Sequence, residues 1–387
     1  MQIQEVEAPA PQTPERTTDK KELESSFDCR GTMPDISTAR LPSISGALTI
    51  AGHRISFRVC VFLAGSTFWI INTLLQTGHA GLVALRSSVC FLVGMILITS
   101  ATRTIRLSQM ATFYCLGGAM MSVVWLVDYG FTILQPDGNA VSRKLFTPFL
   151  EESMKFAPVA VYLWRQRRSR VWSMGASDVL LLAAASGAGF GLVEDAFIQN
   201  HFGVWHPVSW LPTTAILGTG LTIGHQSWTA LAGVTLGLAL LWRPRVPLGY
   251  LLGASGFLWS MLDHFRNNFS VGHSGFIVNF LNFITGHGWL SLYLLLFGAI
   301  AVVGSDVYAE RRMLVSRPQL KLQGAKPPES YGHGEGYKWL WRFLVDRRAL
   351  AYVLFRCQHA SGPTKDKLAL LATTLERRLL KRPFKPI

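Results

Sequence analysis

Charged residues are scarce in this chain: Asp, Glu, Lys and Arg make up 16% of its 387 residues, against 49% hydrophobic residues. A soluble protein of this length would be expected to fold as two or three domains with charge spread over their surfaces. Here the charges instead cluster between long runs that carry almost none. This distribution predicts a polytopic integral membrane protein and argues against a soluble multidomain enzyme.

Several other signals are also missing. The N-terminus has no basic, apolar and small-residue order of a signal peptide, and no repeat recurs at a fixed period. No His-Glu-x-x-His motif occurs, and the five cysteines lie far apart without Cys-x-x-Cys spacing. The cysteines therefore indicate neither a zinc knuckle nor a disulfide framework.

The hydrophobic runs predict an all-α fold, a transmembrane helical bundle of about eight spans. A bilayer core requires about 20 mostly apolar residues for each helical crossing. The candidate crossings are 57–75, 87–102, 111–134, 145–164, 177–198, 222–242, 248–265 and 285–304. They form a predicted membrane domain over residues 55–305.

Both ends of the chain are polar. Residues 1–54 are rich in Pro, Ser, Thr and charge and are predicted to be a disordered tail. Residues 306–387 are predicted to form a small basic helical appendage, because 337–357 and 364–382 show helical apolar spacing. This appendage could rest on anionic lipid headgroups or be a solvated pair of surface helices.

The formal charge of +14 first raises the possibility of a nucleic-acid partner, but its location argues against one. Arginines gather at alternate ends of successive predicted helices, whereas the segments near 76–85 and 199–210 contain no Lys or Arg. The positive-inside rule then predicts a multi-pass protein of the cell membrane with both termini in the cytoplasm. The predicted partners are the lipid bilayer and a membrane-protein or peptide substrate, and no oligomeric state follows from the sequence.

Ionisable residues inside the predicted crossings are candidate functional groups, since placing one in hydrocarbon costs several kcal/mol. Glu151, Glu152 and Lys155 lie in the fourth crossing, where spacings of three and four put the lysine over both carboxylates. Two adjacent carboxylates disfavour ionising together, and the ammonium restores at least one charge. Glu194 lies near the outer end of the fifth crossing.

Two histidines complete the set. His225 begins the sixth crossing, and His264 lies near the end of the seventh, four residues before Asn268. Each motif alone is as well explained by an ion pair or an interfacial residue. However, crossings four and six run inward while five and seven run outward, and all the polar residues fall at the outer end. We therefore expect one water-accessible pocket near the outer leaflet.

In this order, Glu-Glu-x-x-Lys, Phe-x-x-x-Glu, His-x-x-Trp-Thr and His-x-x-x-Asn resemble the PrsW family of intramembrane proteases. That family is related to the CAAX prenyl-protein endopeptidases and bacteriocin-immunity proteins. The resemblance covers about residues 57–304. Lys155 and Glu194 favour the PrsW branch, since the CAAX relatives have an arginine after a longer gap and a histidine at these places.

The resemblance implies peptide-bond hydrolysis in or beside the membrane, as in site-1 cleavage of a single-pass anti-sigma factor. Glu151 or Glu152, with Glu152 favoured, would deprotonate water, and Lys155 would hold the charge of the pair. His225 and His264, with Glu194 or the other glutamate, could bind a zinc ion, and Asn268 could steady the oxyanion or a histidine tautomer. The same groups also allow a metal-free route.

Three alternatives stay open. Gly253-Ala254-Ser255-Gly256 matches the motif of rhomboid serine proteases, but the later candidate base, His287, lies at the opposite side of the membrane from Ser255, so helix packing is the better interpretation. A proton-coupled transporter or channel would also need buried carboxylates and histidines, but its polar residues would continue through the bilayer. A scaffold that binds a partner without cutting it is the third.

Overall fold

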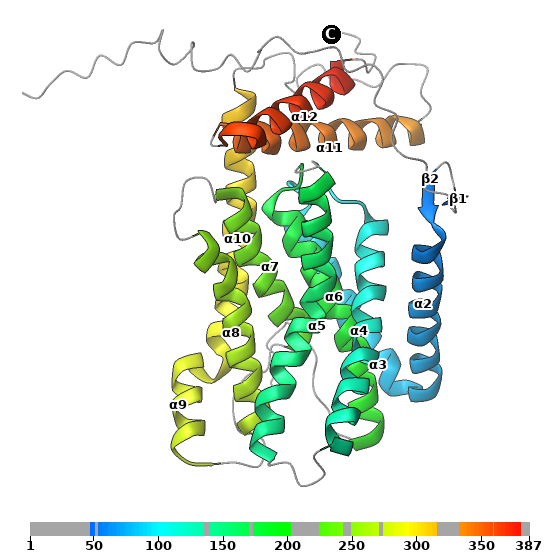
Figure 1. Cartoon of the computed structure of the whole chain (residues 1–387), viewed down its shortest axis with the longest axis vertical. Helices are drawn as coiled ribbons and strands as arrows, with labels where there is room; N and C mark the ends of the chain where they lie inside the picture. The colour runs from blue at the N-terminus through cyan, green and yellow to red at the C-terminus, as the bar shows by residue number, and fades with distance from the viewer. Residues whose placement is uncertain are drawn as a thin grey trace, which may run out of the picture. The chain divides into compact units, whose positions relative to one another are not determined.

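The computed structural model describes residues 47–50, 53–134, 140–169, 173–202, 224–242, 249–270, 274–315, 333–358 and 360–380. Its elements are β1 (Ala47–Ile50), β2 (His53–Ser56), α2 (Phe57–Thr77), α3 (His79–Thr99), α4 (Leu107–Leu134), α5 (Ala140–Ser169), α6 (Ala176–Phe202), α7 (Gly224–Trp242), α8 (Gly249–Ser270), α9 (Phe276–Thr285), the 3-10 turn η1 (Gly286–Gly288), α10 (Trp289–Leu314), α11 (His333–Cys357) and α12 (Gly362–Leu380). Figure 1 shows long helices side by side, with α11 and α12 across one end of the bundle.

The predicted disordered tail lies largely outside the described residues. Its last part differs from the prediction, because β1 and β2 pair as an antiparallel hairpin, with Ala47 opposite Ser56 and Ile50 opposite His53. The hairpin leads directly into α2. Apart from this hairpin, the described regular structure is helical, as predicted.

Helices occur at all eight predicted positions, but their ends differ. The segment near 76–85, predicted to be a loop, is mostly helix, since α2 and α3 are joined by a tight turn at Gly78, whose φ is +53°. A residue without a Cβ adopts this conformation without strain. The last crossing is preceded by α9, and α10 runs to Leu314, past the predicted domain boundary at 305/306.

Within the described residues, four stretches are long and apolar enough to cross a membrane. They are His79–Thr99, Leu107–Ile133, Ala176–Phe197 and Phe276–Leu314. Large apolar side chains such as Phe68, Leu126 and Phe297 face outward from the bundle. Side chains of this kind are stable on an outer surface when lipid rather than water covers it.

The centre of the bundle is α6. Its most apolar stretch is wholly buried, and α3, α4, α5, α7 and α10 pack around it. Small residues allow this close approach: a Cβ on Gly117 would collide with the Ser186 carbonyl, and one on Gly189 with the Tyr114 carbonyl. The backbones of α4 and α6 therefore lie in direct contact, as small residues permit in membrane helix pairs.

Two buried aspartates hold the first turn of α6. Asp306 of α10 accepts hydrogen bonds from the backbone N–H groups of Ala176 and Ser177, both at 2.8 Å. Asp178 accepts from the N–H groups of Gly175 and of Thr104 in the α3–α4 loop, at 2.8 and 2.6 Å. The carboxylates satisfy backbone donors that have no partner inside the helix and favourably oppose the positive end of its dipole.

The C-terminal helices occur where the apolar spacing predicted them, but they share the core of the bundle instead of standing apart from it. Leu350 and Phe355 of α11 belong to the same buried cluster as Val179 and Leu180 of α6. Tyr352 donates a hydrogen bond of 2.8 Å to the carbonyl of Thr102.

Arg356 of α11 is buried at this junction. Burial lowers the pKa of the Arg356 guanidinium to about 10, against the opposing influence of Asp306 and then Asp178. The neighbouring phenol of Tyr352 has its pKa raised, first by burial and then by Asp306. The apolar spacing over 337–357 predicted a helix there, and the structure adds that α11 shares a buried core with α6.

Candidate active site

The site is built on α5, where two glutamates and a lysine share one side of a buried helix turn. The Lys155 ammonium lies 2.7 Å from Glu152 Oε1 and 3.6 Å from Glu151 Oε2. The three side chains are 6% exposed or less. A buried ammonium is stable only beside compensating charge, and the spacings of three and four residues supply it from the same helix.

His225, at the start of α7, contacts residues of both α5 and α6. Its Nδ1 lies 2.6 Å from Lys155 Nζ, and its Nε2 lies 3.1 Å from Glu194 Oε2. Glu194 and its neighbour Asp195 are both buried near the same end of α6. The imidazole therefore lies between a cation from α5 and a carboxylate from α6.

His264 closes the cluster from α8. Its Nδ1 lies within hydrogen-bond distance of Glu152 Oε1, at 2.9 Å. Its Nε2 faces Glu151 Oε2 at 3.6 Å and the Asn268 amide at 3.3 Å. The two imidazole rings meet edge to face, with their centroids 5.2 Å apart. All seven residues singled out from the sequence are thus brought together by four helices.

Sequence reasoning missed a second layer that fixes His264. The indole of Trp228 stacks on the imidazole, with centroids 4.4 Å apart and planes 16° apart. Asp263 accepts hydrogen bonds from Trp228 Nε1 at 2.8 Å and Ser291 Oγ at 2.7 Å, and it pairs with Arg266 Nε at 2.8 Å. Trp228 lies inside the His-x-x-Trp-Thr motif and Asp263 directly precedes His264, so both could have been found as neighbours of the motifs.

The alternative serine site is not supported by the geometry. The Ser255 hydroxyl donates to the Leu252 carbonyl of its own helix, at 2.8 Å. His287 lies in the turn between α9 and α10, with φ at +54°. Ser255 thus uses its hydroxyl within α8.

The charges of the cluster are unequal. The cluster contains four buried carboxyl groups, those of Glu151, Glu152, Glu194 and Asp195. Lys155 supplies an ammonium to them, whereas the nearby Arg266 pairs with Asp263 instead. Glu151 Oε2 is buried and accepts no hydrogen bond from the described residues. Such a site requires further positive charge, supplied by protons or by a metal cation.

The donor set fits a metal ion. Glu151, His225 and His264 each offer one ligand atom, and these three atoms lie within 4.8 Å of one another. Ligand atoms about 2.1 Å from a tetrahedral zinc ion lie about 3.4 Å apart, and Glu151 Oε2 is 3.6 Å from His264 Nε2 and 3.9 Å from His225 Nδ1. Glu194, predicted from the sequence as a ligand, lies on the other side of His225.

The second nitrogen of each ring also fits. Glu152 faces His264 Nδ1, and Glu194 faces His225 Nε2. Metal-binding histidines usually present their other ring nitrogen to a carboxylate in this way. Lys155 is the group that must move, since its ammonium now lies 2.6 Å from His225 Nδ1. Its ion pair with Glu152 can hold the ammonium after it leaves His225.

Comparison with known proteins identifies the family of the chain. Residues 86–304, more than half of the chain, match the model of the PrsW family of intramembrane metalloproteases, and this range contains every residue of the cluster. No curated protein and no solved structure matches the chain. With its apolar helices and its buried cluster of glutamates and histidines, the chain belongs to the PrsW family of intramembrane metalloproteases.

Proposed function

We propose that the chain hydrolyses a peptide bond in or beside the membrane-spanning segment of a membrane protein, at the cluster of Glu151, Glu152, Glu194, His225 and His264. The observation that carries this proposal is the convergence of α5, α6, α7 and α8 on one buried set of carboxylates and imidazoles. The family supports the reaction class, and the contacts support the roles proposed below for the residues.

Glu152 positions other groups. It faces His264 Nδ1 and accepts from Lys155, so a proton placed on Nδ1 leaves His264 Nε2 directed at Glu151 as an acceptor. The sequence favoured Glu152 as the base. The contacts favour Glu151 for proton uptake in a metal-free route, because its Oε2 accepts no hydrogen bond from the described residues.

A zinc ion would be held by Glu151, His225 and His264. When bound, it would polarise the scissile carbonyl and make its water acidic. The protein groups then have the remaining tasks: Glu152 and Glu194 orient the two imidazoles, Lys155 balances carboxylate charge, and Asn268 hydrogen-bonds His264 or the carbonyl oxygen. In the metal route Glu151 would bind the zinc ion, whereas in the metal-free route Glu151 would accept the proton from water.

Orientation completes the proposal. We propose that α2, α5, α7 and α8 cross the membrane together with the four most apolar stretches, which gives eight crossings. Each contains 19 or more residues and packs alongside other crossing helices. The alternating arginines support the proposal that both termini are cytoplasmic and that the cluster lies near the outer leaflet. A single-pass protein such as an anti-sigma factor is the proposed substrate.

The test is a comparison of new protein N-termini in cells that produce the wild type, Glu152→Ala or His264→Ala, measured by mass spectrometry of membrane fractions. The proposal expects at least one single-pass protein to be cut only with the wild type. Ser255→Ala, a conservative change on α8 outside the cluster, is the control and should cut normally. Cleavage unchanged in both variants would reject the assigned site.

A chelator and a flux assay separate the remaining possibilities. In purified, reconstituted protein, loss of cleavage with a zinc chelator and its recovery with added zinc would support the metal route, whereas insensitivity would support the metal-free one. Proton flux across the same liposomes without proteolysis would instead support the transporter.

A further inference from the structure

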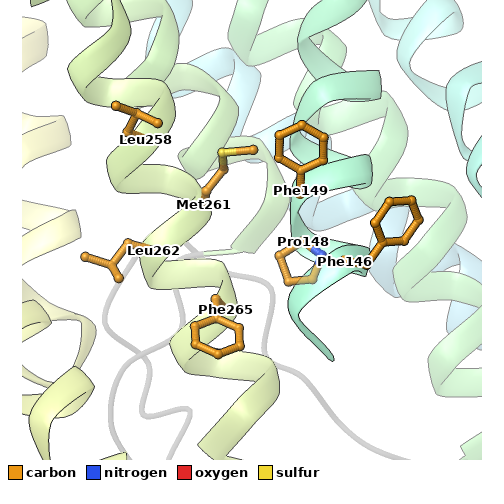
Figure 2. A pocket seen from close by; sticks show the side chains of 7 residues that line it. All are labelled: Phe146, Pro148, Phe149, Leu258, Met261, Leu262 and Phe265. Carbon is orange, nitrogen blue, oxygen red and sulfur yellow. The ribbon is translucent and has the colours of Figure 1, made fainter. Parts of the chain in front are cut away.

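An apolar groove opens between α5 and α8, beside the cluster. It has a volume of about 500 Å³ and is lined by Phe146, Pro148, Phe149, Leu258, Met261, Leu262 and Phe265. Figure 2 shows the side chains of the two helices on either side of this space. Phe149 and Leu258 are 56% and 60% exposed, so the groove is open at the outer surface of the bundle.

The groove lies directly beside the reacting groups. Phe149 is three residues before Glu152 and Met261 three before His264, so each groove residue shares a helix side with a residue of the cluster. Glu152 and His264 meet between the same two helices at 2.9 Å. A chain lying in the groove would therefore lie next to the helix sides that carry Glu152 and His264.

Helix α5, which forms one wall of the groove, contains a proline at which it can bend. Pro148 lies inside α5, where it cannot donate the backbone hydrogen bond to the carbonyl four residues earlier. Helices bend most readily at such positions. Farther along, the rings of Phe156 and Phe257 meet with centroids 6.0 Å apart and join α5 to α8 again. The two helices can thus separate at the groove while they stay joined at Phe156 and Phe257.

The chemistry of the groove identifies its occupant. Its lining is wholly apolar and includes three phenylalanines, so it offers side-chain packing without a charge or hydrogen bond to bind a polar peptide. The protein belongs to a family of intramembrane metalloproteases. A substrate segment that spans the bilayer would be an apolar helix, because lipid cannot satisfy the hydrogen bonds of an extended backbone. Ridges of side chains on such a helix can pack between those of α5 and α8.

We propose that this groove is the lateral entrance through which the membrane-spanning helix of the substrate docks before its peptide bond reaches Glu152 and His264. The proposal rests on the proposed function, since it assumes that the substrate lies in the bilayer. It assigns Phe149 and Met261 as the residues that contact the substrate helix first.

Photo-crosslinking in liposomes tests the entrance. A photoreactive benzoylphenylalanine replaces Phe149 or Met261 in a Glu152→Gln background, which keeps the probe intact. Matched controls place it at Val161, also exposed on α5, and at Leu126, which lines a second surface groove made by α4 and α6. The probe is a biotinylated, lysine-flanked peptide with 20 alternating leucines and alanines interrupted by one Gly-Pro pair.

The proposal expects peptide crosslinks at positions 149 and 261 at least fivefold more abundant than at the two controls. Equal yields at all four positions, or a maximum at position 126, would overturn it, and so would crosslinks to lipid alone at 149 and 261. These outcomes do not depend on catalysis. If the wild type cuts its substrate but the crosslinks are uniform, the proposed function stands and the proposed entrance is wrong.

Filling the groove gives a second test on the active protein. Phe149→Trp and Met261→Trp should raise the KM for a cleaved single-pass protein at least fivefold with kcat changed less than twofold, whereas Val161→Trp should leave both constants unchanged. An equal fall of kcat in the groove variants, with KM unchanged, would contradict a docking role.

Discussion

Asp263→Ala should be among the most destabilising single substitutions in the bundle. The Asp263 carboxylate is fully buried and lies against Arg266, Trp228 and Ser291 at 2.7–2.8 Å. Removing one partner of a buried ion pair costs about 3–5 kcal/mol. The two lost hydrogen bonds act in the same direction, so an unfolding free energy lower by at least about 3 kcal/mol is expected.

Graded variants separate charge from hydrogen bonding. Asp263→Asn keeps an acceptor for Trp228 and Ser291 but loses the charge opposite Arg266, so its cost should be smaller, about 1–3 kcal/mol. Trp228→Phe keeps an aromatic ring over His264 but removes one donor from a buried carboxylate, which should cost about 1–3 kcal/mol. Denaturant unfolding in detergent micelles measures all three.

Activity provides an independent readout of the same network. Trp228 stacks on His264 and is held by Asp263, so Asp263→Ala should also lower kcat/KM by about 10–100-fold, as is usual for groups that orient metal-binding or catalytic side chains. An unfolding free energy of Asp263→Ala within about 0.5 kcal/mol of the wild-type value, the range of an ordinary surface substitution, would show that this network does not stabilise the bundle.

Three further changes test other parts of the structure. Asp306→Ala leaves the N–H groups of Ala176 and Ser177 without their acceptor and should lower the unfolding free energy by about 2–5 kcal/mol, measured in micelles; an effect below about 0.5 kcal/mol would refute the capping role. Gly189→Ala should lower the unfolding free energy by at least about 1–3 kcal/mol, because the added methyl group meets the Tyr114 carbonyl. Gly304→Ala is the control and should not destabilise its helix, since the space around Gly304 is open. Equal effects of the two changes would contradict the close packing of α4 on α6. Glu151→Gln should weaken zinc binding, measured by calorimetry, by at least tenfold, while Glu310→Gln, at the α10–α11 contact, should not; equal affinities would remove Glu151 from the metal site.

Much of the site could be predicted because helix geometry and membrane physics constrain it tightly. Spacings of three and four place Glu151, Glu152 and Lys155 on one side of α5 whatever surrounds that helix. The cost of burying charge then predicts that His225 and His264 lie near these carboxylates, and the distances confirm that they do. The catalytic roles stay predictions.

What could not be predicted depends on contacts between helices. Glu151 rather than Glu194 groups with both histidines because of how α5, α7 and α8 pack, and sequence spacing carries no such information. Asp263 and Arg266, three residues apart near a helix end, look like an ordinary interfacial pair until Trp228 is placed between Asp263 and His264. Tyr352 lies in an apolar run from Ala349 to Phe355, and the sequence carries no information that its hydroxyl meets the Thr102 carbonyl of another segment.

The account depends on one cluster performing proteolysis with groups from four helices. The most direct test is single-turnover cleavage of one purified substrate in liposomes by the wild type, Glu151→Gln, Glu152→Gln, His225→Gln and His264→Gln, with Ser255→Ala as control. We expect each of the four cluster variants to be slowed by at least a hundredfold and the control to match the wild type. Cleavage at the wild-type rate by any two of the four, with the fold intact, would contradict the account.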